Sequence, residues 1–256
     1  MTDIGIKPAW PAPPAVHALT TTRQGGVSTG AWFSLNLADH VGDDPGHVAQ
    51  NRTRLIDALQ LPSAPLWLQQ VHGTRVIDAG NAASVPEADA TYTTRTGVVC
   101  TVLTADCLPV LLCDRAGSRV AAAHAGWRGL VAGVLEATVA AMAVPADSLL
   151  AWFGPAISAP AYIVGDEVRE AFMAQAAESA AAFQPAVDGD WHADLYALAR
   201  QRLAAVGVSA IFGGDRCSLR EPDSFYSYRR DGAATGRMAS LIWLGNGQER
   251  VIPSDR

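Results

Sequence analysis

Apolar and polar residues follow two different periods along the chain, and each period predicts a different kind of element. Short runs rich in β-branched and apolar residues predict strands at residues 17–22, 66–71, 97–104, 110–113, 119–123, 149–153 and 209–212. Longer stretches with apolar residues three and four positions apart predict helices at residues 45–59, 130–142, 166–181 and 194–205. Asp43 or Asp44 can cap the first of these helices.

The order of these elements favours an α/β (α+β) fold with mixed β-sheets flanked by helices. Strands and helices mix throughout, without a steady βαβ alternation or a GxGxxG loop. No low-complexity linker or internal repeat divides the chain, which predicts a single layered domain over residues 1–256. The proline-rich residues 1–14 are expected to form an extended N-terminal segment.

Composition and charge argue against a disordered protein and against two classes of partner. Hydrophobic residues make up 49% of the chain and charged residues 17%, which supplies a large core and argues against disorder. The net charge is −6 and no lysine or arginine run stands out, so neither nucleic acid nor an anionic membrane is an expected partner. A few local arginines can still bind a small anion.

The remaining bulk features predict a cytoplasmic protein, and we expect it to be a monomer or a homodimer. The N-terminal residues lack the basic start and unbroken apolar stretch of a signal peptide. The longest uncharged stretch, residues 148–165, is interrupted by glycine and proline and makes a poor membrane span. The four cysteines form no CxxC pair and are expected to be reduced.

Three residues stand where an apolar strand gives way to a glycine- or proline-containing turn: His72, Cys107 and His124. Imidazole and thiolate both bind zinc, and catalytic zinc commonly has three protein ligands and an open position. The spacings of 35 residues (72 to 107) and 17 residues (107 to 124) suit such an open site better than a structural one. Spacing alone leaves a second reading open, in which the histidines are loop residues and the cysteine is simply buried.

Several short strings in fixed order closely resemble the YfiH-like, laccase-domain family. They are TTRQGGVS at 21–28, SLNL at 34–37, HVGDD at 40–44, QVHG at 70–73, TADCLPV at 104–110, HAGWRG at 124–129, GPAI at 154–157 and FYSYRRDG at 225–232. The resemblance runs from about residue 17 to residue 244, which is nearly the whole chain. Several strings in order are far more specific than one short motif.

The resemblance implies a zinc ion bound by His72, Cys107 and His124. It also implies phosphorolysis of adenosine, inosine, guanosine and methylthioadenosine, with inorganic phosphate as co-substrate, and deamination of adenosine to inosine. The arginine of the first string, Arg23, resembles one that helps to bind phosphate or substrate, so it joins the three ligands as a catalytic candidate. Without the resemblance, Arg23 would be read as an exposed loop residue.

Other residues near these strings are weaker candidates. Arg128 follows His124 where a helix is expected to start, so it can bind an anion or form a structural ion pair. Asp106 can orient a ligand or cap a turn. Of the adjacent Arg229 and Arg230, one can reach the site. Cys100 and Cys113 are expected in the core, and His40 can approach the site.

Three other functions remain open. A metal-free or zinc amidohydrolase acting on peptidoglycan precursors could use Cys107 as nucleophile and His124 or His72 as base. A single blue-copper site is compatible with two histidines and a cysteine, but six histidines are too few for a multicopper oxidase. A non-enzymatic module with structural zinc would want four closely spaced ligands. The HxE and PCxxC signature of nucleobase deaminases is absent, so deamination would use an unrelated site.

Overall fold

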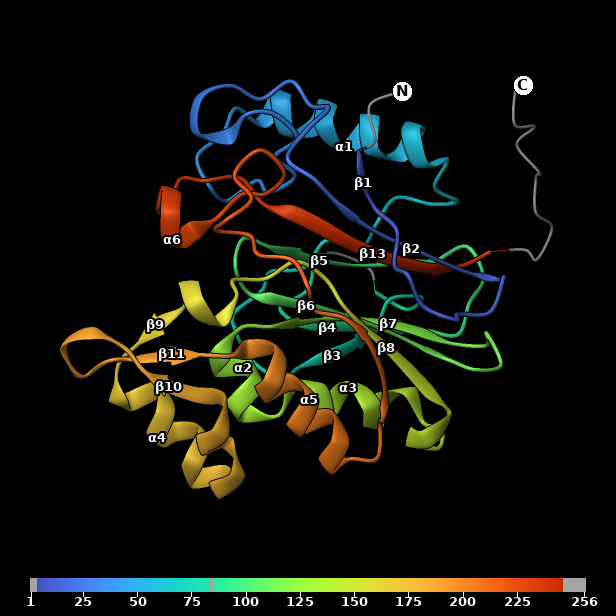
Figure 1. Ribbon diagram of the computed structural model, residues 1–256. Coiled ribbons are helices and arrows are strands. Elements are labelled where there is room, and N and C mark those ends of the chain that lie inside the picture. The colour runs from blue at the N-terminus through green and yellow to red at the C-terminus, as the bar shows by residue number, and fades with distance from the viewer. Residues whose placement is uncertain (1–3, 83–84, 246–256) are drawn as a thin grey trace, which may run out of the picture.

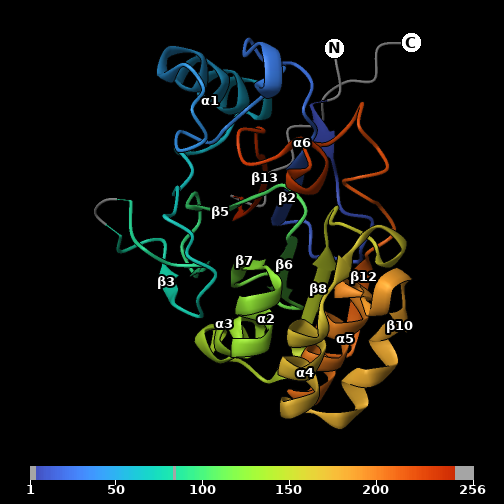
Figure 2. The ribbon, with the colours of Figure 1, turned by 90° about the vertical axis from the view of Figure 1, so that its left-hand side faces the viewer.

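Two sheets packed face to face, with helices on their outer faces, form the body of the fold (Figures 1 and 2). The computed structural model describes residues 4–82 and 85–245. The four-stranded sheet has the order β1 (Gly5–Ile6), β2 (Val16–Thr21), β13 (Met238–Leu244), β5 (Val99–Thr104). The six-stranded sheet has the order β12 (Ala210–Gly213), β8 (Leu149–Phe153), β6 (Leu108–Asp114), β7 (Val120–Ala125), β4 (Ala90–Thr93), β3 (Val76–Asp78).

The sheets mix parallel and antiparallel neighbours, as expected from the irregular order of elements. β12 and β8 are parallel, as are β3 and β4, while the other neighbours in these two sheets are antiparallel. A third, antiparallel sheet contains β10 (Phe183–Pro185), β11 (Trp191–Ala193) and β9 (Ile163–Val164). The predicted α/β (α+β) class with mixed sheets flanked by helices is confirmed.

Helices cover both outer faces. α1 (Pro45–Leu59) lies over the four-stranded sheet, whereas the six-stranded sheet is covered by α2 (Trp127–Ala132), α3 (Val134–Met142) and α5 (Leu195–Ala205) (Figure 1). α4 (Asp166–Gln175) lies beside the three-stranded sheet, and α6 (Tyr228–Asp231) is a single turn. Short 3-10 helices span Gly30–Trp32, Ala146–Ser148, Ala159–Ala161, Ala177–Ala182 and Val187–Gly189. Within the described residues, none of the helices combines the length and apolarity needed to cross a membrane.

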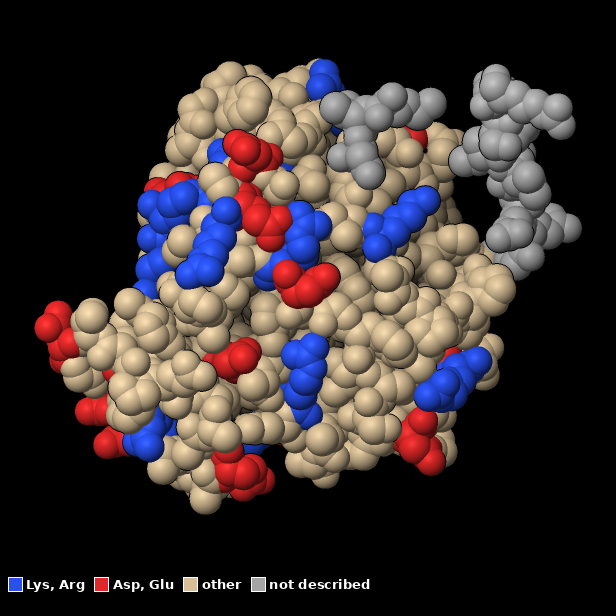
Figure 3. All heavy atoms as spheres, in the orientation of Figure 1, with Lys and Arg blue, Asp and Glu red and all other residues tan. Residues whose placement is uncertain are grey.

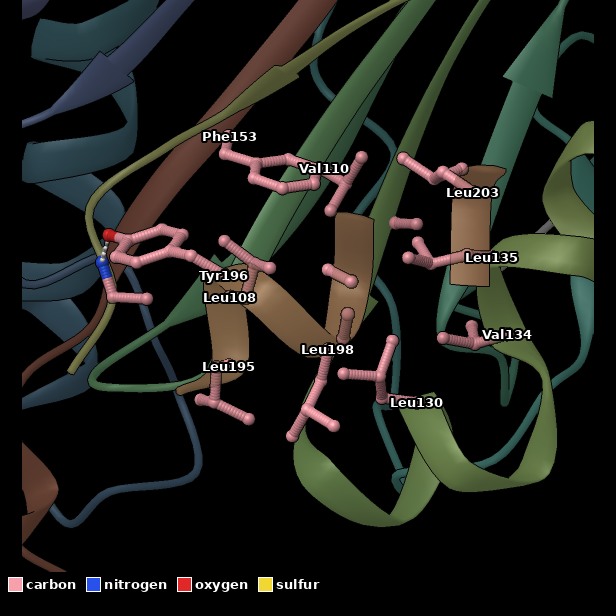
Figure 4. Close-up of a cluster of buried hydrophobic side chains, with 14 of the residues drawn as sticks. Leu108, Val110, Leu130, Val134, Leu135, Phe153, Leu195, Tyr196, Leu198 and Leu203 are labelled. Carbon is pink, nitrogen blue, oxygen red and sulfur yellow. Dashed lines mark hydrogen bonds between the residues drawn. The ribbon is translucent and has the colours of Figure 1, made fainter. Parts of the chain in front are cut away.

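The buried hydrophobic residues form four clusters between these elements. Figure 4 shows the largest, in which leucine and valine side chains of β6 meet those of α2, α3 and α5. The hydroxyl of Tyr196 on α5 accepts a hydrogen bond from the Ala156 amide and contacts two further backbone carbonyls. Between the two sheets lie Cys100 of β5 and Cys113 of β6, both fully buried, as the sequence predicts.

Capping residues and glycine conformation explain which helices have the predicted bounds. Helix α1 has the predicted bounds because the Asp44 carboxylate caps it, accepting hydrogen bonds from Gly46 and His47, and because Pro45 opens it. The predicted helix 130–142 starts earlier, at Trp127, and is divided by Gly133, whose φ of 101° is left-handed. The predicted helix 166–181 ends at residue 175 and continues as a 3-10 turn.

The strand predicted at 66–71 is wrong. Its backbone makes one hydrogen bond from the Leu66 amide to the carbonyl of Val99 and an isolated bridge from Gln69 to Glu87. The side chain of Gln70 pairs with the backbone of Leu103. The apolar run at residues 66–71 therefore lies beside β5 without forming a strand of the sheet. Seven strands were not predicted, namely β1, β3, β4, β9, β10, β11 and β13. Residues 1–3 of the expected N-terminal segment lie outside the described residues, and the rest contains only the two-residue strand β1.

Candidate metal centre

His72, Cys107 and His124 converge at one end of the six-stranded sheet. One nitrogen of each imidazole and the sulfur of Cys107 all lie within 4.8 Å of one another. The sulfur is 3.7 Å from Nε2 of His72, and the two imidazoles meet edge to face with ring centroids 4.7 Å apart. His124 is buried, Cys107 is half-buried and His72 is exposed, so the group is closed on one side and open on the other.

Strand pairing brings two of these residues together. Leu108 of β6 pairs with Ala125 of β7, so Cys107, immediately before β6, and His124, on β7, lie close to the same end of the sheet. The third residue arrives on the loop that precedes β3, where His72 has a left-handed φ of 60°. Gly126 leaves the space for it, because a Cβ atom there would lie 2.6 Å from Cδ2 of His72 and 3.0 Å from the sulfur of Cys107.

A buried carboxylate, Asp89, holds two of the three segments. Its oxygens accept hydrogen bonds from Nδ1 of His124 at 2.8 Å and from the backbone amides of His72 and Gly73 at 2.9 and 2.7 Å. This residue carries no motif of its own in the sequence, since it lies between two alanines ahead of a strand that the hydrophobic pattern did not reveal. It is the most important site residue that sequence reasoning missed.

The electrostatics of the group favour a thiolate. Burial raises the pKa of the Cys107 thiol, but the charge of His124 and hydrogen bonds from both imidazoles outweigh burial and lower it below its ordinary value. For His124, burial lowers the pKa, and the Cys107 thiolate together with the Asp89 carboxylate raises it above the ordinary value. The two shifts agree on a thiolate beside an imidazolium when no metal is bound.

The donor set fits zinc. Two imidazoles and one thiolate are ligand types that zinc prefers, and three protein ligands leave a position open on the exposed side. Among the described residues, this is the group of histidine, cysteine and acidic side chains whose ligand atoms lie close enough to share one metal ion. A multicopper arrangement would need further clusters, and the described part of the chain offers no second one.

A cavity of about 430 Å³ opens over the three residues. Its walls carry the guanidinium groups of three arginines and the rings of three aromatic residues, namely Arg128, Arg229, Arg237, Trp127, Tyr162 and Tyr228. His40 also lines it, as its position in the HVGDD string suggested. Basic side chains gather on the surface around α6, with acidic ones among them (Figure 3). The volume lies within the range of about 300–1,000 Å³ typical of small-molecule sites.

All three cavity arginines lie over aromatic rings, and the guanidinium of Arg237 is 6.0 Å from the ring centroid of Tyr228. The guanidinium of Arg128 lies 4.4 Å from the ring centroid of Trp127. That of Arg229 lies 5.4 Å from the ring of Tyr162 and donates a hydrogen bond to the carbonyl of Ile163. Stacking holds a guanidinium in place while leaving most of its N–H donors free for a ligand.

Arg23 and Arg230 lie outside this cavity. The guanidinium of Arg23 stacks 4.7 Å from the ring of Tyr226 and donates hydrogen bonds to the carbonyls of Phe33 and Pro222. It therefore joins two loops in this structure. Of the two adjacent arginines, Arg229 is the one that lines the cavity, while Arg230 pairs with Asp231.

Asp106 contacts none of the three candidate ligands through a hydrogen bond in the described structure. Its carboxylate accepts hydrogen bonds from the hydroxyls of Ser218 and Ser227 and from the amide of Arg229. Its φ is 93°, which is unusual for a residue other than glycine. Asp106 thus fastens the C-terminal loop and α6 to the turn that carries Cys107, and the carboxylate beside the imidazole is Asp89 instead.

A family model described as multi-copper polyphenol oxidoreductase laccase matches residues 17–245. The chain belongs to this YfiH-like, laccase-domain family. Purine nucleoside phosphorylase YfiH of Escherichia coli is 58% identical over 240 residues, covering 93% of this chain and 98% of that protein. Purine nucleoside phosphorylase PA4543 of Pseudomonas aeruginosa is 55% identical over the same length and coverage.

Solved structures of similar proteins share the fold. Neisseria meningitidis protein NMB0706 superimposes with a TM-score of 0.92 at 52% identity, covering 95% of this chain and all of that chain. YlmD from Geobacillus stearothermophilus has a TM-score of 0.86 at 31% identity, with the same coverage. The layered arrangement of sheets and helices is therefore that of the laccase-domain family.

Proposed function

We propose that this laccase-domain protein is a zinc-dependent purine nucleoside phosphorylase that also deaminates adenosine. His72, Cys107 and His124 would hold the zinc, and inorganic phosphate would be the co-substrate of adenosine, inosine, guanosine and methylthioadenosine. The observation that carries the proposal is the cavity, in which three convergent ligand atoms lie beside arginines and aromatic rings. Relatives 58% and 55% identical are called purine nucleoside phosphorylases, which supports the same activity here.

Phosphorolysis depends on positioning and charge. A phosphate oxygen forms a bond to C1′ of the ribose while the bond from C1′ to the purine nitrogen breaks, and the purine leaves with the electron pair and takes up a proton. Arg128 is the best placed residue to hold the phosphate, because no acceptor within the described residues takes a hydrogen bond from its guanidinium. Arg229 and Arg237 add positive charge in the same cavity.

The aromatic residues supply a surface for the purine. Tyr228 lines the cavity and is 54% exposed, so its ring can stack on a purine beside the Arg237 guanidinium, which lies 6.0 Å from the ring centroid. Stacking of a base on an aromatic ring is worth about 1–3 kcal/mol in nucleic-acid complexes. Because every purine has the same π-face, recognition by stacking is consistent with a range of purine nucleosides rather than one.

The metal would serve the deamination. When bound, zinc supplies Lewis acidity and hydroxide at neutral pH, the chemistry needed to replace the amino group at C6 of adenine. Around it, Asp89 orients His124, and Gly126 keeps the approach between His72 and Cys107 open. Asp106 holds Arg229 at the cavity wall.

The test is a chromatographic assay with adenosine, run with and without phosphate. Adenine that forms only with phosphate reports phosphorolysis, inosine reports deamination, and hypoxanthine reports both in succession. We expect these products from the wild type and none from Cys107→Ala. The matched control is Cys113→Ala, which removes a buried thiol from the same sheet without touching the cavity and should retain activity.

Other outcomes separate the alternatives. A folded, zinc-loaded wild type that yields no purine product would refute the proposal and make peptidoglycan precursors the substrates to test. Activity in metal-free protein would favour a Cys107 thiol enzyme, since that thiolate already has two imidazoles beside it. Oxidation of phenols by a copper-loaded protein would instead favour the oxidase reading.

A further inference from the structure

Four hydrogen-bond donors from two separate segments converge on the single carboxylate of Asp89. This residue is fully buried and immediately precedes β4, the strand beside β7. Oδ1 accepts from Nδ1 of His124 at 2.8 Å and from the His72 amide at 2.9 Å, while Oδ2 accepts from the Gly73 amide at 2.7 Å and the Val71 amide at 3.2 Å. Both oxygens are therefore fully engaged behind the candidate ligands.

The contact with His124 selects one form of its ring. A carboxylate only accepts hydrogen bonds, so Nδ1 of His124 carries the proton and Nε2 is left as the atom that can bind a metal. The backbone amide of His124 also donates to the carbonyl of Asp89 at 2.8 Å. Both the tautomer and the position of this ring are thus set from residue 89.

The contacts with the loop fix the backbone of the other imidazole ligand. A left-handed φ of 60° at His72 is unfavourable for a residue with a Cβ. In this conformation, the amides of residues 71, 72 and 73 all point to the same carboxylate. Hydrogen bonds to a charged acceptor are stronger than those between neutral groups and offset the strain.

We propose that Asp89 is the positioning residue of the metal centre, setting both His72 and His124 without being a ligand itself. The inference rests on the proposed zinc site, and it goes beyond it by assigning the site's metal affinity to a residue outside the ligand set. Removing the carboxylate would free the left-handed loop and the buried ring at once. Both imidazoles would then have to be ordered by the metal during binding.

The variant that tests this is Asp89→Asn. An asparagine keeps the shape but directs an NH₂ group at backbone amides, which leaves donors unpaired. Zinc affinity, measured by competition with a chromophoric chelator, is expected to fall by about 10- to 100-fold. The absorption spectrum of the cobalt-substituted protein should change with it, since that spectrum reports ligand geometry rather than overall folding.

The matched control is Asp114→Asn. Asp114 is also buried, and it accepts three hydrogen bonds where Asp89 accepts four. Its donors are the amide and hydroxyl of Ser118 and the amide of Arg119, at the opposite end of β6. Its replacement should lower the free energy of unfolding and leave zinc affinity within about threefold of the wild type. Equal weakening in both variants would overturn the inference, because the effect would then reflect general stability.

The other possible results distinguish a failure of the proposed metal centre from a failure of the inference about Asp89. A wild type that binds no zinc would overturn the metal centre, and the inference with it. A zinc-binding wild type with an equally tight Asp89→Asn variant would overturn the inference alone. Should the variant not fold, the wild type still decides: long-range ¹H–¹⁵N spectra of the zinc-loaded protein should show the His124 proton on Nδ1, and a proton on Nε2 would refute the assignment.

Discussion

The close approach at Gly126 makes the sharpest prediction about the metal centre. Its backbone has a φ of −66° and a ψ of 157°, which alanine adopts without strain, so Gly126→Ala tests space and nothing else. The added methyl would lie 2.6 Å from Cδ2 of His72 and 3.0 Å from the sulfur of Cys107. The first distance is shorter than Cβ atoms show in real structures and the second is tighter than nearly all of them, so both His72 and Cys107, two of the three proposed ligands, must shift.

The size of the effect on zinc affinity depends on whether the crowded side chains can move away from the new methyl group. Without metal, the exposed His72 side chain can turn away, so the stability of the metal-free protein should change little. Metal binding requires the ring to return against the methyl group, and an overpacked contact of this kind costs about 1–3 kcal/mol. Since about 1.4 kcal/mol is a tenfold change, zinc affinity should weaken by roughly 5- to 150-fold.

The assay is zinc competition alongside thermal unfolding of the metal-free protein, with Gly73→Ala as the matched control. A Cβ atom at Gly73 would meet its nearest neighbours at 3.5 and 3.6 Å, which are ordinary contacts, although it lies beside the same histidine. The control should bind zinc like the wild type. Unchanged zinc affinity in Gly126→Ala would refute the reasoning, because His72 and Cys107 would then not be joint ligands.

Three further predictions concern phosphate, thiol reactivity and the core. Arg128→Ala should raise KM for phosphate severalfold. Arg23→Ala should lower the melting temperature and leave KM for phosphate unchanged. The reverse pattern would identify Arg23 as the phosphate ligand. In metal-free protein, iodoacetamide should modify Cys107 below pH 8, because the lowered pKa of this thiol preserves the thiolate until the pH falls through that pKa. Burial raises the pKa of Cys100 to about 12, so Cys100 should remain an unmodified thiol. Mass spectrometry distinguishes the two sites. Tyr196→Phe should lower the free energy of unfolding by about 1–3 kcal/mol in a denaturant titration, since it leaves the buried Ala156 amide unpaired, with zinc affinity unchanged.

The three candidate ligands could be predicted because each is chemically distinctive and stands at a change of local pattern. Long apolar runs and capped helices were equally visible, as β8 and α1 show, because burial and capping leave marks within a few residues. The short strands β3 and β4 leave no such mark. Each is held by its neighbours rather than by its own composition, and a strand of three or four residues has too few positions for a period.

Roles that depend on contacts between distant segments could not be predicted from the sequence, because no local pattern marks them. Asp89 looks ordinary in the sequence, and its role arises only when the loop at residue 72 and strand β7 meet around it. Arg237 enters the cavity because β13 pairs with β5, a contact that no local pattern encodes. Arg23 was placed among the candidates by a conspicuous motif, and its role at the site stays a prediction; the structure adds that its guanidinium joins two loops, which no local pattern indicated.

The place of β13 between β2 and β5 has a consequence for synthesis of the chain. The four-stranded sheet joins residues 16–21 to residues 238–244, so it cannot be completed until almost the whole polypeptide has left the ribosome. The three candidate ligands are all translated by residue 124, whereas two of the cavity arginines, at positions 229 and 237, emerge more than a hundred residues later. During translation, the nascent chain therefore presents the three candidate ligands well before the cavity walls around them exist.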